Sequence, residues 1–182
     1  AQRRRTAARV VLCGRRVPGA ASALVRTAGQ VPVLIAYCAA APPQGLSALS
    51  DAGCTLLALP PSRARPECPD PGSLLKALGE QGASSILVEG GREVLGSFFD
   101  ERLVDRVVVF VAPCIIGGAQ AVTAVGGHGS QNIEAAITLV GDVVFRAGGR
   151  MPARAQTVVQ MVGPDVMLQG WVCDPMRWAP RA

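Results

Sequence analysis

Short apolar runs alternate along the chain with segments of helical pattern, and this alternation predicts an α/β fold. The apolar runs are rich in β-branched residues, and Gly or Pro bounds several of them, so we interpret them as strands. The predicted strands are residues 9–13, 31–37, 54–59, 84–88, 106–112, 137–145, 157–162 and 166–172. The predicted helices are residues 20–28, 45–52, 72–80 and 92–101.

The order of these elements predicts a mixed, mainly parallel sheet. Helices separate the first strands, as in parallel βαβ units. Near the end of the chain, a turn at Gly163-Pro164 joins two strands into an antiparallel hairpin. A chain of 182 residues suits one domain, so we expect a single domain over residues 1–182. The proline-rich residues 60–71 are expected to form a surface loop rather than a linker.

Composition excludes two classes of protein. Hydrophobic residues make up 49% of the chain and charged residues only 17%, which is incompatible with intrinsic disorder. The longest purely apolar run, residues 107–113, is far shorter than the roughly 20 residues of a transmembrane helix. We therefore expect a folded protein with no membrane partner.

The net charge of +5 arises at the N-terminus, because residues 1–50 hold seven arginines and no acid. Such a segment is compatible with a phosphate or nucleic-acid patch, with an organelle transit peptide, or with a solvated surface shaped by coding bias. No aromatic residue precedes Tyr37, whereas RNA-binding surfaces usually interleave aromatic and basic residues. We favour the solvated surface and expect no nucleic-acid partner.

The six cysteines form no C-x-x-C pair, and the single histidine, His128, is the only nitrogen ligand available to join them. We therefore expect no metal site. No signal-peptide pattern opens the chain, and several cysteines lie in apolar runs. This pattern favours a reduced, cytoplasmic protein. His128 lies in a glycine loop, where we expect a solvated side chain rather than one stacked on a ligand.

Candidate chemistry is concentrated at Ile86–Arg92, where a predicted strand ends in Glu89-Gly90-Gly91 and continues into a helix. The first N–H groups of a helix have no intrahelical acceptor and lie at the positive end of its dipole. Two glycines allow a phosphate to approach these groups, and the Glu89 carboxylate would accept hydrogen bonds from hydroxyls or amines. A purely steric role for the glycines in a tight turn remains the alternative.

Residues 84–118, SSILVEGGREVLGSFFDERLVDRVVVFVAPCIIGG, resemble the reductase domain of the riboflavin-biosynthesis deaminase/reductases, relatives of dihydrofolate reductase. The segments RVVLCGRRVP at residues 9–18 and VQMVGPDVMLQGWV at residues 159–172 resemble further parts of that domain. The resemblance implies a dihydrofolate reductase-like three-layer fold and an insertion at residues 146–156. It also implies a cis peptide between Gly90 and Gly91.

The resemblance implies NADPH-dependent reduction of 5-amino-6-(5-phosphoribosylamino)uracil to its ribitylamino form. Glu89 would contact this pyrimidine ribosyl phosphate, and the chain would form a homodimer. The residues expected to contact the cofactor are Gly14, Gly90, Gly91, Arg92, Glu93, Val94, Leu95, Gly96 and Ser97. Cys13-Gly14 stand where the family usually has Asp-Ser, so Arg15 or Arg16 would have to compensate in recognising the 2′-phosphate.

Other departures from the family leave a second hypothesis open. The family's Ser-x-Asp-Gly strand and G-x-G-T loop are not found in this sequence, nor is the zinc signature of the deaminases. Relative to the family, the chain is therefore expected to be incomplete at its N-terminus. The alternative function is a non-catalytic nucleotide-binding or interaction module derived from the same fold. An algal or plant source would imply the chloroplast stroma instead of the cytoplasm.

Overall fold

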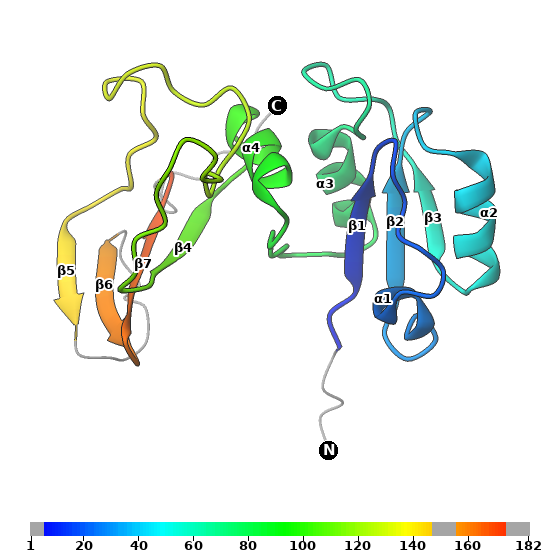
Figure 1. Cartoon of the computed structure of the whole chain (residues 1–182), viewed down its shortest axis with the longest axis horizontal. Coiled ribbons are helices and arrows are strands. Elements are labelled where there is room, and N and C mark those ends of the chain that lie inside the picture. The colour runs from blue at the N-terminus through cyan, green and yellow to red at the C-terminus, as the bar shows by residue number, and fades with distance from the viewer. Residues whose placement is uncertain (1–5, 147–155, 174–182) are drawn as a thin grey trace. The chain divides into compact units, whose positions relative to one another are not determined.

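The computed structural model describes residues 6–146 and 156–173, shown in Figure 1. The chain divides into two compact units, residues 1–87 (unit 1) and residues 88–182 (unit 2).

Unit 1 contains a parallel sheet of three strands in the order β1-β2-β3. These strands are β1 (Arg9–Cys13), β2 (Val33–Tyr37) and β3 (Thr55–Ala58). In the register of the sheet, Ile35 pairs with Val11 on one side and Leu56 on the other. The central strand β2 is almost completely buried, which agrees with its unbroken run of apolar residues.

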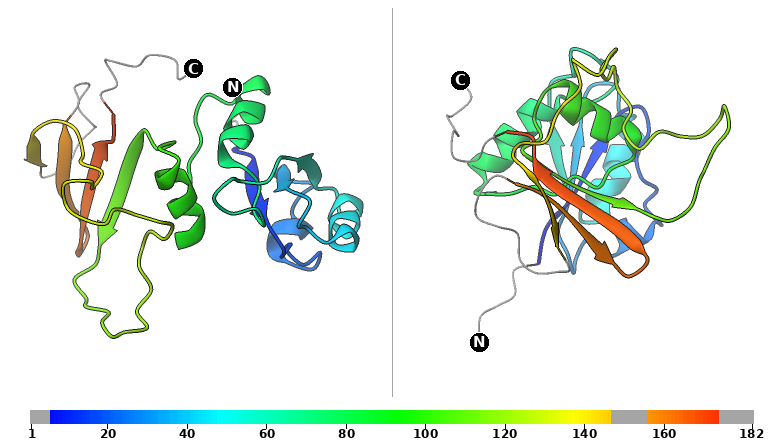
Figure 2. Two further views of the ribbon diagram at one scale, coloured as in Figure 1. Left: turned by 90° about the horizontal axis from the view of Figure 1, so that it is seen from above. Right: turned by 90° about the vertical axis from the view of Figure 1, so that its left-hand side faces the viewer.

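Helices cover both faces of this sheet, so unit 1 has three layers (Figure 2). The helices are α1 (Ala23–Arg26), α2 (Pro43–Asp51) and α3 (Pro71–Glu80). Alternate residues of β2 point to opposite faces. Ile35 packs in one cluster with Val25 of α1 and Leu49 of α2, whereas Leu34 packs in a second cluster with Leu74 of α3. Complete burial of a side chain such as Leu49 or Leu74 contributes about 1.5–3 kcal/mol to stability.

Unit 2 contains a mixed sheet of four strands in the order β4-β7-β6-β5, together with helix α4 (Arg92–Asp100). The strands are β4 (Arg106–Val111), β5 (Val143–Arg146), β6 (Thr157–Val162) and β7 (Asp165–Trp171). Strand β7 is antiparallel to both β4 and β6, and β5 is parallel to β6. The predicted C-terminal hairpin is confirmed, and Gly163 adopts φ +61° in its turn.

The α/β class, the parallel strands and the C-terminal antiparallel pair are therefore confirmed. Two strand predictions need correction. The prediction of a strand over residues 137–145 is wrong for its first part, because only Val143–Arg146 pairs with a neighbour. The prediction of a buried strand over residues 84–88 is also wrong, since this segment has no regular structure and most of it is exposed. A β-rich segment becomes a strand only where a second strand pairs with it, and none of the described residues does so here.

Two predictions fall mainly outside the described residues. The insertion expected at residues 146–156 lies there except for its two end residues, and Arg3, Arg4 and Arg5 of the basic N-terminus lie there too. Within the part of the chain that the structure describes, no helix has both the length and the apolar character needed to cross a membrane.

Candidate functional site

The first turn of α4 lacks the side-chain cap that two other helices have. Ser22 and Asp70 cap α1 and α3 by accepting hydrogen bonds from the N–H groups of Val25 and Ser73, at 3.4 Å and 2.7 Å. The N-cap of α4 is Gly91, which has no side chain to offer. Helix α4 therefore begins with N–H groups that no side chain caps. These groups lie at the positive end of the helix dipole, an arrangement that suits an anion.

The two glycines before α4 differ in what their surroundings require. A Cβ atom on Gly90 would come within 2.7 Å of the Cβ atom of Val94, so packing explains this glycine. A Cβ atom on Gly91 would meet nothing within 4 Å, and its φ of −64° is open to every residue type. Neither packing nor backbone conformation therefore demands glycine at 91. The open space in front of the helix is what a phosphate group would need in order to reach the N–H groups.

The expected cis peptide between Gly90 and Gly91 is wrong, because none of the described peptide bonds is cis. The turn into α4 is made with trans peptides. The N–H groups of Val94 and Leu95 both donate to the carbonyl oxygen of Gly91, at 3.0 Å and 3.1 Å. The N–H groups of Arg92 and Glu93 have no acceptor within the helix and are the donors best placed for a ligand.

Charge at this turn is balanced rather than strongly positive. The Nε atom of Arg92 lies 2.9 Å from an Oε1 atom of Glu93, and both side chains are about half exposed. An exposed ion pair of this kind contributes about 0–1 kcal/mol, so an anionic ligand can compete for the guanidinium. The Glu93 carboxylate interacts favourably with the positive end of the helix dipole, but it would repel a bound phosphate.

Further along α4, the predicted cofactor residues are engaged within the protein. Gly96 is buried, and Val94 and Leu95 are half-buried. The Ser97 hydroxyl donates to the carbonyl oxygen of Glu93 at 3.0 Å. The predicted contacts of unit 2 are thus brought together on one short segment, but Gly91, Arg92 and Glu93 are the ones that lie at the helix terminus.

Glu89 and Gly14 lie in different surroundings. Glu89 is exposed and lies between residues 84–88, which were expected to be a strand, and α4. Gly14 belongs to unit 1 and follows β1, where a Cβ atom would collide with the carbonyl oxygen of Glu67. Close packing of the 60–71 loop therefore explains the glycine at 14.

Glu67 in this loop also carries a shifted carboxyl group. The pKa of Glu67 is lowered by a hydrogen bond from its own backbone N–H and by Arg65, with a smaller contribution from Arg15.

Residues 126–129, Gly-Gly-His-Gly, lie against α4, a contact that the sequence did not predict. The Gly126 N–H donates to the carbonyl oxygen of Arg92 at 2.9 Å, and Asp100 accepts from the N–H groups of His128 and Gly129. The His128 side chain is exposed, as expected. Three glycines within four residues were the signal in the sequence, because such a segment allows close contact between backbones.

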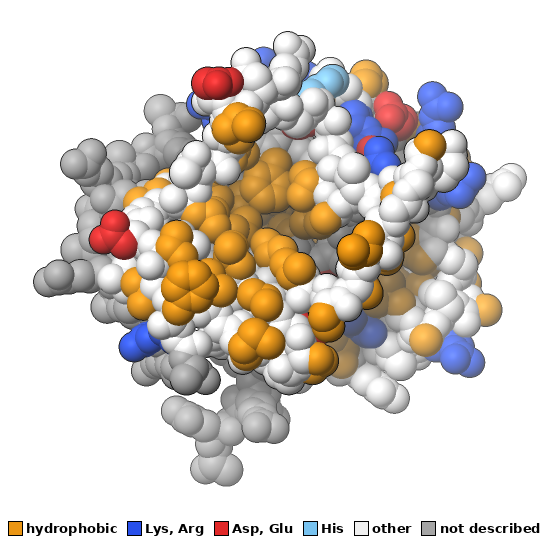
Figure 3. All heavy atoms as spheres, turned by 60° about the vertical axis from the view of Figure 1, so that its left-hand side comes forward, with side chains coloured by type: hydrophobic (Ala, Val, Ile, Leu, Met, Phe, Trp, Pro, Cys, Tyr) orange, Lys and Arg blue, Asp and Glu red, His pale blue; other side chains and the backbone are white. Residues whose placement is uncertain are grey.

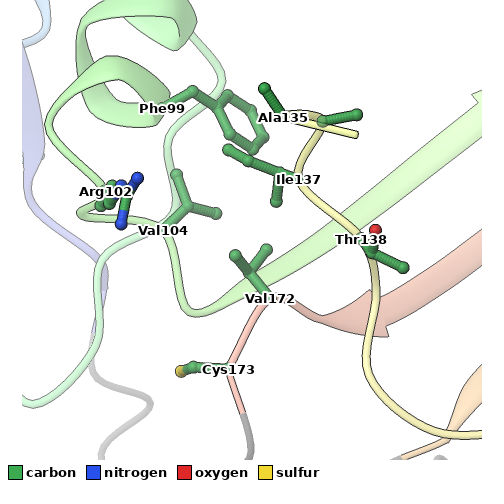
Figure 4. A pocket seen from close by; sticks show the side chains of 9 residues that line it. Phe99, Arg102, Val104, Ala135, Ile137, Thr138, Val172 and Cys173 are labelled. Atoms are coloured by element: carbon green, nitrogen blue, oxygen red, sulfur yellow. The ribbon is translucent and has the colours of Figure 1, made fainter. Parts of the chain in front are cut away.

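An open pocket of about 370 Å³ lies at the other end of α4 (Figure 4). Its lining is mostly apolar and includes Phe99, Ile137 and Val172, with Arg102 and Cys173 at its edge. This pocket does not include the first turn of α4. Among the described residues, no group of three or more His, Cys, Asp and Glu side chains could hold a metal ion.

The parallel sheet of unit 1, covered by helices on both faces, is an arrangement typical of α/β proteins that bind nucleotides. Comparison with known families identifies the particular class. Residues 1–148 match the family described as the RibD C-terminal domain, and the chain belongs to this family.

Individual relatives agree with this assignment. The chain is 32% identical over 114 residues to riboflavin biosynthesis protein RibD of Actinobacillus pleuropneumoniae, covering 63% of this chain and 26% of that protein. It is 30% identical over 105 residues to 2,5-diamino-6-ribosylamino-4(3H)-pyrimidinone 5′-phosphate reductase of Aquifex aeolicus, covering 58% of this chain and 45% of the relative. The matched segments thus span between a quarter and a half of these relatives.

A solved structure supports the fold alone. A pyrimidine reductase-like protein of Corynebacterium diphtheriae aligns with a TM-score of 0.52 at 16% identity. The alignment covers 91% of this chain and 60% of the other chain.

Proposed function

We propose that this chain acts as a pyrimidine reductase of riboflavin biosynthesis. The proposed reaction is the NADPH-dependent reduction of 5-amino-6-(5-phosphoribosylamino)uracil to its ribitylamino form. Membership of the RibD C-terminal domain family supports the reaction class, and the Aquifex relative carries the name of a pyrimidinone 5′-phosphate reductase. The single observation that carries the proposal is the uncapped first turn of α4, where Gly91 leaves open space before the N–H groups of Arg92 and Glu93.

The residues at this turn have separate proposed roles. The N–H groups of Arg92 and Glu93 would donate to the cofactor phosphates, and the Arg92 guanidinium would add a positive charge. Gly90, which has no side chain, would let the backbone pack closely against Val94. Gly91 would leave the space in front of the first-turn N–H groups open for the phosphates. Val94, Leu95, Gly96 and Ser97 would support this surface from within the helix. When bound, the nicotinamide would supply a hydride for the sugar C1′ of the substrate.

Glu89 is proposed to hold the substrate. An exposed carboxylate just before the glycine turn can accept hydrogen bonds from the amines of a pyrimidine or the hydroxyls of a sugar. Arg15 and Arg16, which are exposed and follow Gly14, would pair with the 2′-phosphate of NADPH and so favour it over NADH.

We further propose a homodimer in the cytoplasm. Apolar side chains gather on one face of unit 2, as Figure 3 shows. The exposed large apolar residues of unit 2 include Val108, Phe110, Val111, Ile115 and Ile116. Exposed apolar patches of this kind usually mark a surface that associates with another protein. Sedimentation equilibrium tests this part, and a monomer at micromolar concentration would contradict it.

Turnover of NADPH tests the proposed function. Purified protein is mixed with NADPH and the pyrimidine ribosyl phosphate, and NADPH oxidation is followed by absorbance together with the formation of the ribitylamino product. Glu89→Gln is expected to raise the KM for the pyrimidine while folding is retained, because Glu89 is exposed. Glu80→Gln, an exposed carboxylate at the end of α3, is the matched control.

The possible outcomes separate the hypotheses. NADPH binding without oxidation would favour the non-catalytic module instead. Equal pyrimidine KM values for wild type and Glu89→Gln would remove the substrate role of Glu89 while leaving the reductase reaction intact.

A further inference from the structure

Helix α4 ends in an acidic residue at a position where the helix dipole disfavours negative charge. Asp100 is the last residue of α4, and carboxylates are destabilising near the C-terminus of a helix. Its two oxygens nevertheless have specific partners. Oδ2 accepts a hydrogen bond from the His128 N–H at 2.7 Å, and Oδ1 accepts one from the Gly129 N–H at 3.1 Å. The hydrogen bonds, rather than helix stability, therefore account for an acid at this position.

These bonds hold one end of a backbone segment, residues 126–129, which we call the strap. The other end of the strap reaches the first turn of α4, where the Gly126 N–H donates to the carbonyl oxygen of Arg92 at 2.9 Å. Between the two ends, the strap packs directly on the helix backbone. A Cβ atom on Gly96 would lie 2.5 Å from the carbonyl oxygen of Gly126.

The glycines of the strap are explained by the same contacts. Gly127 adopts φ +82°, in the left-handed region, and a Cβ atom there would collide with the Asp100 carboxylate. A Cβ atom on Gly126 would lie 3.0 Å from the carbonyl oxygen of Arg92 and 3.3 Å from its Nε atom. The strap thus contacts the backbone of Arg92, lies beside the Nε atom of its guanidinium, and is held in place by Asp100.

We propose that Asp100 is a positioning residue for the cofactor site: by fixing the strap along α4, it holds Arg92 and the first-turn N–H groups in the geometry that binds phosphate. This inference rests on the proposed function of the α4 terminus. Asp100 itself does not contact the ligand in this proposal. It acts through residues 126–129, which connect the C-terminal end of the helix to its first turn.

The test measures NADPH affinity and turnover for three variants of Asp100. Asp100→Ala removes both acceptors, Asp100→Asn keeps one acceptor oxygen, and Asp100→Glu keeps two. Glu80→Gln is the matched control, because it also removes an acidic charge from the last residue of a helix, α3. We expect the Kd for NADPH to rise about 3- to 30-fold in Asp100→Ala, the range for residues that act on a site through neighbours. Asp100→Asn should fall between this variant and wild type.

A positioning role also predicts which quantities stay constant. At saturating NADPH, kcat and the KM for the pyrimidine should remain within about twofold of wild type, since uniform weakening of one ligand leaves the chemical step unchanged. Asp100→Glu should recover at least part of the affinity, and Glu80→Gln should bind NADPH as wild type does. Equal NADPH affinity in wild type and Asp100→Ala would overturn the proposal. The proposal would also be overturned if Asp100→Glu lost as much NADPH affinity as Asp100→Ala, because that result would indicate general disruption of the helix.

Hydrogen exchange in the ligand-free chain separates failure of this proposal from failure of the proposed function. In Asp100→Asn, the amides of residues 126–129 and of the first turn of α4 should exchange faster than in Glu80→Gln. Unchanged exchange at the first turn would refute the link between Asp100 and Arg92. A wild-type chain that binds no NADPH would refute the proposed cofactor site, whatever the exchange of the strap shows.

Discussion

Replacing Gly96 by alanine tests the close packing between α4 and residues 126–129. Alanine is the better helix former by about 1 kcal/mol, so a substitution in free space should stabilise the protein. Gly96 has no such space, because its Cβ atom would lie 2.5 Å from both the carbonyl oxygen of Gly126 and the nitrogen of Gly127. These are backbone atoms, which cannot rotate away as the end of a flexible side chain can.

The size of the effect follows from two opposing contributions. Overpacking of a tightly packed site costs about 1–3 kcal/mol, which equals or exceeds the gain in helix propensity. Gly79 of α3 provides the matched control, since its Cβ atom would meet nothing within 4 Å. We therefore expect Gly79→Ala to be stabilising, Gly96→Ala to be neutral or destabilising, and the two variants to differ by about 1–3 kcal/mol.

Thermal unfolding followed by circular dichroism measures this difference. For a chain of this size, each kcal/mol corresponds to a change in Tm of about 2–4 °C. Hydrogen exchange of residues 126–129 would show whether the loss arises at the strap. A Gly96→Ala variant as stable as Gly79→Ala, with unchanged exchange at the strap, would refute the packing argument.

Two further predictions concern single side chains. Gly91→Ser should stabilise α4 by a few tenths of a kcal/mol, because serine supplies the missing N-cap, but it should weaken NADPH binding by occupying the same N–H groups. Gly29→Ser, at a glycine whose Cβ atom would also meet nothing within 4 Å, is its control in calorimetric titrations, and unchanged affinity in Gly91→Ser would contradict the anion site. Burial raises the pKa of the Cys13 thiol to about 11 from 9.0, so the folded state retains this proton longer than the unfolded state as the pH rises. Stability measured by urea unfolding should therefore fall between about pH 9 and pH 11, and Cys13→Ala should reduce this fall; an equal fall in both proteins would show that another group is responsible.

Most elements were predictable because their signals are local. Strand β1 and strand β6 have the bounds expected from their β-branched runs, and α3 begins one residue before its predicted start. The glycine turn before α4 was also predictable from a local signal, because a helix with an apolar face follows the two glycines directly. Local signals were enough to locate the candidate anion site, although not to assign its ligand.

What the sequence did not reveal depends on contacts between distant residues. Residues 84–88 have the composition of a strand, but pairing rather than composition decides whether a strand forms, and they stay exposed here. The parallel pairing of β5 with β6 was missed because register and direction are set across the sheet. The role of Asp100 was hidden likewise, because its partners lie 28 and 29 residues away in the sequence.

Hydrogen exchange with and without NADPH tests the central claim most directly. A phosphate bound at the first turn of α4 would accept hydrogen bonds from the amides of Arg92 and Glu93, which have no intrahelical acceptor. We expect saturating NADPH to slow exchange in peptides covering residues 90–94. Residues 71–74 at the start of α3, where Asp70 already caps the helix, should remain unchanged. Exchange at residues 90–94 that is the same with and without millimolar NADPH, in the folded chain, would contradict the proposed cofactor site.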